Sequence, residues 1–297
     1  MLIKTIPAKT IITKKPDTAW FGTDYNMNIY KGCSHGCIYC DSRSDCYQVS
    51  DFDTIRVKEN AITIIEDELR RKVKTGVIGT GSMSDPYNPL EDELLLTRKS
   101  LELMDQYHYG VGIATKSALI ARDADILSHI KKHSPVICKI TITAYDDMLC
   151  RKLEPNVSVS SERFDAIRKL CEAGVFTGVL MMPLLYSLTD TPDNIRNIVH
   201  AAHRNGARFI YSLFGVTMRS GQREYFLHKL EELFPGKHYL QQYLSLYGFS
   251  YECHSPREKE LNLIFHEECE KLGLLYRMED IIKAYKKGYN YQQYSLF

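Results

Sequence analysis

Hydrophobic positions in residues 24–234 alternate between two kinds of segment. Short apolar runs predict strands over residues 24–30, 76–82, 109–115, 136–143, 175–181 and 207–214. Apolar residues at helical spacing, such as Ile62, Ile65 and Leu69, lie between these runs. They predict helices over residues 59–73, 91–107, 123–132, 160–173, 192–205 and 222–234.

Strands that alternate with helices predict an α/β fold with a parallel sheet. A complete barrel of this kind needs eight strand–helix units, and the pattern supplies six. We therefore expect a partial (βα)6 barrel of the TIM type over residues 24–235. Residues 1–23 would be a lead-in. Residues 236–297 would be a helical C-terminal extension and tail, with a helix over about residues 256–272.

A short loop after the first expected strand carries the clearest chemical signal. It reads KGCSHGCIYCD, and Gly32 and Gly36 allow tight turns in it. Its cysteines are spaced C-x3-C-x2-C, at Cys33, Cys37 and Cys40.

Three thiolates on one loop suit a metal ion or an iron–sulfur cluster. Zinc in a closed structural site takes four protein ligands, and the fourth here would be His35, Cys46 or a distant residue. A [4Fe–4S] cluster held by three cysteines instead keeps one iron open for a substrate or cofactor.

The cysteine motif, with Tyr39 as the aromatic residue before the last cysteine, resembles that of the radical S-adenosylmethionine (SAM) superfamily. The resemblance implies a [4Fe–4S] cluster and SAM as cofactors. In that family the open iron binds SAM, and reductive cleavage of SAM gives a 5′-deoxyadenosyl radical. It also implies a lyase-like or hydrogen-abstracting enzyme that receives electrons from a reductase, flavodoxin or ferredoxin.

A second stretch resembles one branch of that superfamily. Residues 82–91 read SMSDPYNPLE and are followed by Thr97 and Arg98, as in proteins described as DNA-repair photolyases, relatives of spore photoproduct lyase. The resemblance covers roughly residues 24–215. It implies SAM contacts at the carboxyl ends of the strands, where such barrels place their active sites. These contacts would be Tyr39, Ser84, Asp85, Lys116, Thr143 and Glu154.

Spore photoproduct lyase carries a cysteine after the second strand that returns a hydrogen atom to the substrate radical. Ser82 falls near that place here, and no cysteine occurs between Cys46 and Cys138. A serine O–H bond is too strong for this role. We therefore expect a route that does not depend on that cysteine, with Tyr87 and Cys46 as candidate catalytic residues.

Composition and charge bear on the partners and the location of the protein. The net charge of +1 gives no general basic field for nucleic acid, although a local basic groove is compatible with it. The chain start has no signal-peptide core, and no apolar run is long enough for a membrane span. We therefore expect a cytoplasmic protein with no membrane partner.

Three hypotheses stay open at this point. The chain is a radical SAM enzyme acting on a nucleic-acid lesion, or one acting on a protein, peptide or metabolite. Alternatively, it is a non-catalytic, zinc-stabilised module that binds a sliding clamp or nucleic acid. The last five residues bear on partners because Gln293, Leu296 and Phe297 resemble a peptide that docks on bacterial sliding clamps.

Overall fold

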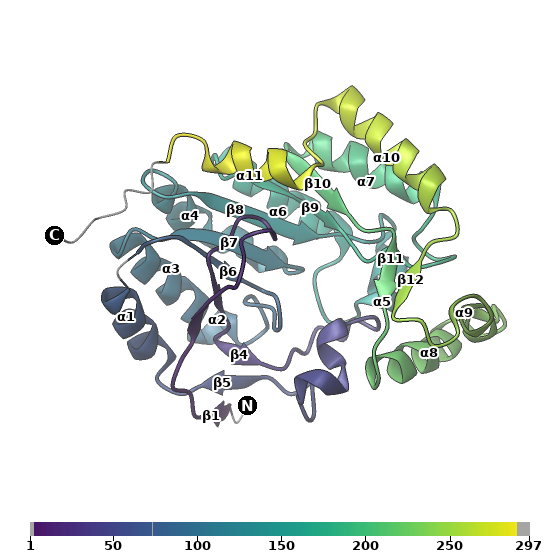
Figure 1. Cartoon of the computed structure of the whole chain (residues 1–297), viewed down its shortest axis with the longest axis horizontal. Coiled ribbons are helices and arrows are strands. Elements are labelled where there is room, and N and C mark those ends of the chain that lie inside the picture. Colours follow the sequence, from purple (N-terminus) through teal and green to yellow (C-terminus); the bar gives the residue numbers. More distant parts are fainter. Residues whose placement is uncertain (1–2, 73, 290–297) are drawn as a thin grey trace.

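The computed structural model describes residues 3–72 and 74–289. Its main sheet has the strand order β10-β9-β8-β7-β6-β3-β2 (Figure 1). The strands are β2 (Ile12–Lys14), β3 (Tyr25–Met27), β6 (Val77–Thr80), β7 (Gly110–Thr115), β8 (Val136–Thr141), β9 (Thr177–Met181) and β10 (Phe209–Ser212). All neighbours are parallel except β2 and β3. The expected α/β fold with a parallel sheet is confirmed, and among the described residues the sheet is open, with β2 and β10 at its edges.

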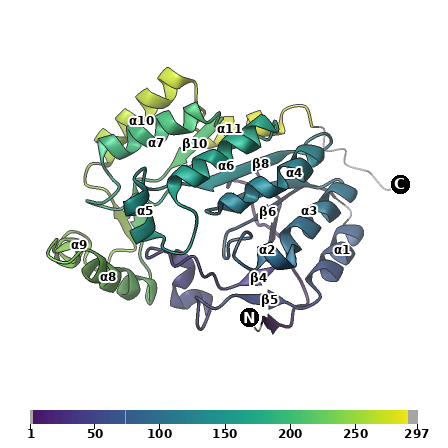
Figure 2. The same cartoon turned by 180° about the vertical axis from the view of Figure 1, so that it is seen from behind.

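Helices cover one face of this sheet (Figure 2). They are α1 (Ala61–Arg71), α3 (Leu96–Gln106), α4 (Ala124–Ile130), α6 (Ser160–Glu172) and α7 (Pro192–Arg204). The helix expected over residues 91–107 is two helices, because α2 (Glu91–Leu94) ends at Leu95, whose φ is 54°. The fully buried Glu91 carboxylate accepts a hydrogen bond from Thr97 N at 2.8 Å, which fixes this break.

The strand expected over residues 24–30 also divides. After β3 the chain enters β4 (Tyr30–Lys31), which pairs antiparallel with β5 (Arg56–Lys58). The latter pairs with β1 (Lys4–Ile6) in a separate small sheet. The cysteine loop therefore begins from this small sheet and not from the main one.

The C-terminal part of the described chain mixes helices with a strand. Its elements are α8 (Gln222–Leu233), α9 (Tyr239–Tyr247), β12 (Glu252–His254), α10 (Glu258–Leu272) and α11 (Met278–Lys286). Two earlier elements were not expected from the pattern, namely α5 (Asp147–Leu153) and β11 (Gly215–Thr217). β12 pairs antiparallel with β11, and α10 packs on α7. Short 3-10 turns occupy Asp41–Arg43, Asp45–Tyr47 and Ala118–Asp123.

The segment before β3 closes the amino end of the sheet. Phe21 is fully buried beside Val77, Ile137 and Phe209, which lie at the starts of their strands. Tyr285 of α11 donates a hydrogen bond from its hydroxyl to Phe21 O at 2.7 Å. This part of the lead-in therefore packs against the amino ends of the strands. The segment boundaries expected at residues 23/24 and 235/236 stay predictions.

In the described part of the chain, no helix has the length and apolar character needed to cross a membrane. The tail residues Gln293, Leu296 and Phe297 lie outside the described residues, so clamp docking stays a prediction.

Candidate active site

The cysteine loop turns at two glycines. Gly32 and Gly36 have φ of 83° and 72°, a left-handed conformation that L side chains rarely adopt. A Cβ on Gly32 would stand 2.3 Å from Thr54 O, so no other residue fits there without movement of that backbone. Next in the chain, Cys33 N donates to Phe52 O at 2.9 Å. The turn thus places the first cysteine against the segment that leads into β5.

The segment after α5 holds the other side of the loop. Ile38 N donates to Leu153 O at 3.0 Å, and Asn156 N donates to His35 O at 3.1 Å. The Asn156 side chain also donates to Ser34 O at 3.1 Å. The loop that carries the cysteines is therefore fixed on both sides by backbone contacts.

Asp85 ties the loop after β6 to the end of β7. Its carboxylate accepts hydrogen bonds from Thr115 Oγ1 at 2.7 Å and from Lys116 N at 2.9 Å. It also lies 3.5 Å from His35 Nδ1. Ser84, its neighbour, donates from its hydroxyl to Gly32 O at 2.7 Å. The two residues thereby connect the cysteine loop to the carboxyl ends of the strands.

A buried polar group stands behind Tyr39. The Tyr39 hydroxyl donates to Glu154, whose other carboxylate oxygen lies 2.5 Å from Arg163 Nη2. Arg163 also donates to Thr141 O at 2.9 Å. Burial alone would raise the pKa of Glu154, but the positive charges of Arg163 and Lys116 lower it by a larger amount. The pKa of Glu154 is therefore below its usual value. Glu154 is therefore a carboxylate that fixes the Tyr39 ring.

The cysteine thiols need a cation to ionise. Burial, followed by the charge of Asp85, raises the pKa of Cys33 to about 12, and burial raises the pKa of Cys37 well above its usual value. Burial alone would lower the pKa of Lys116, but negative charge at Cys37 and Glu154 raises it to about 12. Lys116 is thus an ammonium group beside the cysteine thiols, and its charge favours ionisation of Cys37.

The spacing of the three thiols fits a cluster better than a single ion. Tetrahedral zinc, with Zn–S near 2.3 Å, keeps its sulfurs only about 3.8 Å apart. Within residues 3–72 and 74–289, the one group of such ligand atoms that all lie within 4.8 Å of one another is Asp105, His129 and His133. The three cysteine sulfurs do not meet this limit, so the described structure does not hold them in the compact arrangement of a single zinc ion.

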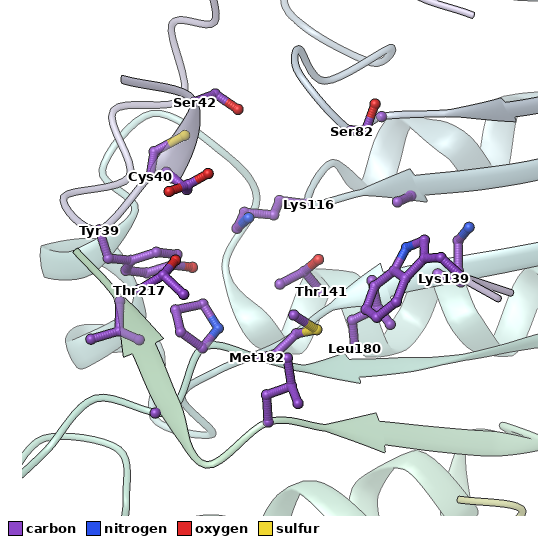
Figure 3. Close-up of a pocket in the computed structure, with 18 of the residues that line it drawn as sticks. Tyr39, Cys40, Ser42, Ser82, Lys116, Lys139, Thr141, Leu180, Met182 and Thr217 are labelled. Carbon is purple, nitrogen blue, oxygen red and sulfur yellow. The ribbon is translucent and has the colours of Figure 1, made fainter. Parts of the chain in front are cut away.

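A cavity of about 500 Å³ opens beside the loop (Figure 3). Tyr39 and Cys40 lie at one end of it, and Lys139 lies at the other. Lys116 and Thr141 stand between these ends. The cavity therefore connects the cysteine loop with the interior face of the main sheet.

The comparison with protein families identifies this arrangement. Residues 27–197, more than half of the chain, match the family model of the radical SAM superfamily. The chain belongs to the radical SAM superfamily. Its cofactors are accordingly SAM and a [4Fe–4S] cluster, which the three free thiols fit.

Two related sequences belong to proteins that are described as uncharacterised. An uncharacterised protein of Mycobacterium tuberculosis is 27% identical over 76% of this chain and 68% of its own length. An uncharacterised protein of Methanocaldococcus jannaschii is 33% identical over 61% of this chain and 68% of its own length.

Solved structures share the fold at low identity. A cysteine-to-serine mutant of spore photoproduct lyase superposes with a TM-score of 0.66 at 18% identity, covering 91% of this chain and 78% of that one. Spore photoproduct lyase complexed with dinucleoside spore photoproduct gives a TM-score of 0.65 at 17% identity, over 88% of this chain and 77% of that one. A radical SAM methyltransferase of Kitasatospora setae gives 0.50 at 13% identity, over 69% and 37%.

Two of the predicted SAM contacts line the cavity of this radical SAM protein, namely Tyr39 and Lys116. Three others, Ser84, Asp85 and Glu154, do not line the cavity; they make the hydrogen bonds described above, which hold the cysteine loop and the Tyr39 ring. β8 ends at Thr141, which lines the cavity, whereas Thr143 follows the strand and accepts at its carbonyl from Asn194 at 2.9 Å.

The two candidate catalytic residues lie elsewhere. Tyr87 is buried, and its hydroxyl donates to Asp123 at 3.1 Å. Cys46 is exposed, and its thiol accepts from Arg219 at 3.5 Å. Their catalytic role stays a prediction without added support from these contacts.

Sequence reasoning missed two residues that line the cavity, Trp20 and Lys139. A lysine in the otherwise apolar run VICKIT was the visible signal for the second. Trp20 falls in the lead-in, where no periodic pattern marks it.

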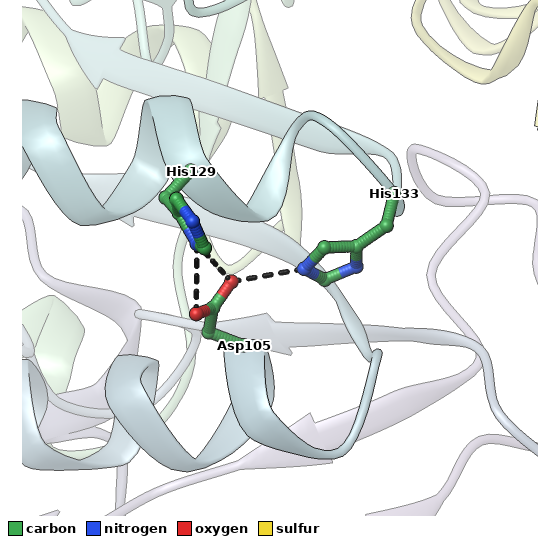
Figure 4. Close-up of side chains that lie close together, drawn as sticks. All are labelled: Asp105, His129 and His133. Atoms are coloured by element: carbon green, nitrogen blue, oxygen red, sulfur yellow. Dashed lines mark hydrogen bonds and ion pairs between the residues drawn. The ribbon is translucent and has the colours of Figure 1, made fainter.

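A histidine–carboxylate group lies on the helix-covered face of the sheet (Figure 4). Asp105 is hydrogen-bonded to His129 Nδ1 at 2.8 Å and to His133 Nε2 at 2.9 Å. Partial burial raises the pKa of Asp105, but these two hydrogen bonds lower it more, so it is below its usual value. The contacts link α3 with the end of α4 and lie apart from the cavity.

Proposed function

We propose that this chain reductively cleaves SAM at a [4Fe–4S] cluster held by Cys33, Cys37 and Cys40. The cluster and SAM together would supply a 5′-deoxyadenosyl radical that abstracts hydrogen from a substrate in the adjoining cavity. The observation that carries this proposal is the cysteine loop fixed beside a cavity lined by Tyr39 and Lys116.

The residues of the chain have separable roles in this proposal. Lys116 carries a permanent positive charge that suits the SAM carboxylate. Tyr39 offers a ring held in place by Glu154. Thr141 offers a hydroxyl on the cavity side, while Ser84 and Asp85 position the loop. We also infer that the open sheet serves as the six-unit partial barrel.

For the substrate we propose a nucleic-acid lesion first. The support is the likeness to spore photoproduct lyase, whose complexes hold dinucleoside spore photoproduct. Ser82 lines the cavity in this chain. Since serine is a poor hydrogen-atom donor, we propose a reaction other than the cysteine-dependent route. The alternative is a protein, peptide or metabolite substrate, which the net charge of +1 leaves open.

Partners follow from the same chemistry. Radical SAM enzymes need a one-electron reductant, and we propose a reductase, flavodoxin or ferredoxin for this role. Against the non-catalytic zinc module stands the match to the radical SAM family model, together with thiols that do not all lie within 4.8 Å of one another in the described residues.

The test is anaerobic reconstitution with iron and sulfide, followed by dithionite and SAM, with 5′-deoxyadenosine as the measured product. We expect product from the wild type and from Cys171→Ala, a half-buried thiol on α6. Cys37→Ala should give none. A wild type that binds iron fully and forms no 5′-deoxyadenosine would contradict the proposal.

A further inference from the structure

β8 carries one charged residue in a strand whose residues are all buried. Lys139 is 3% exposed, and its Nζ lies 4.9 Å from the centroid of the Phe21 ring. Across residues 3–72 and 74–289, the structure gives Nζ no hydrogen bond and no ion pair. The ammonium group thus faces the cavity with its three donors unused.

In the part of the chain that the structure describes, no carboxylate balances this charge. The charged group that bears on it from the lead-in is a second cation, Lys15, whose Nζ donates to Thr23 Oγ1 at 2.9 Å. Burial lowers the pKa of Lys139 to about 8; Cys138 opposes this effect and Lys15 adds to it. A buried charge without a partner costs stability. The Phe21 ring is the favourable contact that the structure gives this charge, and no anion accompanies it in the described part of the chain.

The surroundings of Lys139 differ from those of Lys116. Lys116 stands beside the cysteine thiols and Glu154, which stabilise its charge. Lys139 lies at the opposite end of the cavity, near Leu180 (Figure 3). The Trp20 indole also lines the cavity, is 40% exposed, and lies edge-on at 5.0 Å from the same Phe21 ring that Lys139 contacts. This end therefore combines an available cation with an aromatic and aliphatic wall.

Lys139 and Thr141 lie two positions apart on one strand and point to the same face. Both side chains line the cavity. SAM-binding groups at the Tyr39 end and Lys139 at the opposite end could therefore hold ligands that together fill the space between them.

We propose that Lys139 binds an anionic group of the substrate, a carboxylate or a phosphate ester, while the substrate's apolar part packs on Trp20 and Leu180. This inference rests on the proposed function, because it gives SAM the end of the cavity near Tyr39. It assigns the Lys139 end to the substrate and makes substrate charge a requirement for binding.

Trp20 supplies a direct readout, since it is the only tryptophan in the sequence. The reconstituted protein with SAM is titrated anaerobically with two pairs of probes, and Trp20 fluorescence is followed with excitation at the red edge. One pair is thymidine 5′-monophosphate and thymidine. The other is phenylacetate and phenylacetamide.

We expect at least one anionic probe to bind about tenfold more tightly than its neutral partner, as a charge-assisted contact would give. Lys139→Met should remove this preference. Lys132→Met, an exposed lysine beyond α4, should keep it. A preference in the thymidine pair identifies a phosphate ester as the group bound, and one in the phenylacetate pair identifies a carboxylate.

Three outcomes would overturn the inference: no binding of any probe, equal binding within both pairs, or a preference that survives in Lys139→Met. Circular dichroism and iron content establish that the variant is folded and loaded, and Lys139→Arg, which keeps the charge, should retain the preference. Formation of 5′-deoxyadenosine by the wild type is measured separately, so failure of the radical chemistry is distinguishable from failure of the anion site.

Discussion

The Tyr39 hydroxyl donates a hydrogen bond to Glu154, 115 positions further along the chain. Both side chains are buried, and the same carboxylate pairs with the buried guanidinium of Arg163. One carboxylate thus joins the cysteine loop to α6. Because Glu154 bonds to two buried side chains, loss of its carboxylate is expected to affect both the stability of the fold and the position of the Tyr39 ring.

Glu154→Gln should lower the free energy of unfolding by about 3–5 kcal/mol, because it leaves the Arg163 charge buried and uncompensated. Urea denaturation of the cluster-free protein measures this. The matched control is Glu172→Gln, which removes an exposed ion pair with Arg168. Because exposed pairs contribute little, that change should be barely resolvable. Equal effects of the two substitutions would show that the buried pair has no special weight.

Gly32→Ala tests the geometry of the cysteine loop. The substitution places a Cβ 2.3 Å from Thr54 O in a residue with φ of 83°. Gly273→Ala is the control, since Gly273 has φ of 67° and no atom near its Cβ position. The control should lose about 1 kcal/mol from the left-handed backbone alone. Gly32→Ala should lose more and also incorporate less iron; full iron content would count against the assigned role of this turn.

Lys139→Met should stabilise the protein at pH 7 by up to about 3 kcal/mol, since one pKa unit corresponds to about 1.4 kcal/mol. The pKa of Lys139 is lowered to about 8 in the fold, so the unfolded chain holds this proton more tightly. The free energy of unfolding of the wild type therefore rises with pH between about 8 and the ordinary pKa of lysine, because the folded protein releases the Lys139 proton first. The advantage of the variant should be full below pH 8 and fade above it.

Thermal unfolding of both proteins across this pH range measures the difference. Burial raises the pKa of the neighbouring Cys138 to about 12, and loss of the opposing Lys139 charge would raise it further, away from the pH range tested. A variant that is less stable than the wild type at pH 7 would show that Lys139 has a favourable partner inside the fold.

The sequence predicted the strands well because buried parallel strands are continuous apolar runs. The run VICKIT and its neighbours became β8 and the adjoining strands nearly as expected. The break at Leu95 was not predictable, because it depends on the buried Glu91 carboxylate meeting Thr97 N. Helix α5 is short and has little periodicity, so pattern reasoning passed over it.

The site was predicted only in part for a related reason. Cys33, Cys37 and Cys40 were readable because their spacing itself carries the chemistry. The choice between Thr141 and Thr143 required knowing where β8 ends, and strand ends are the least certain feature of a pattern. Lys139 was passed over because lysine is rarely buried.

The central claim is that the three cysteines hold a [4Fe–4S] cluster with an iron open to SAM. Electron paramagnetic resonance of the dithionite-reduced, reconstituted protein, recorded before and after addition of SAM, tests it most directly. We predict a cluster signal that changes when SAM is added in the wild type and in Cys171→Ala, and no such signal in Cys37→Ala. A protein that binds one zinc per chain and shows no SAM-sensitive cluster signal would contradict the account.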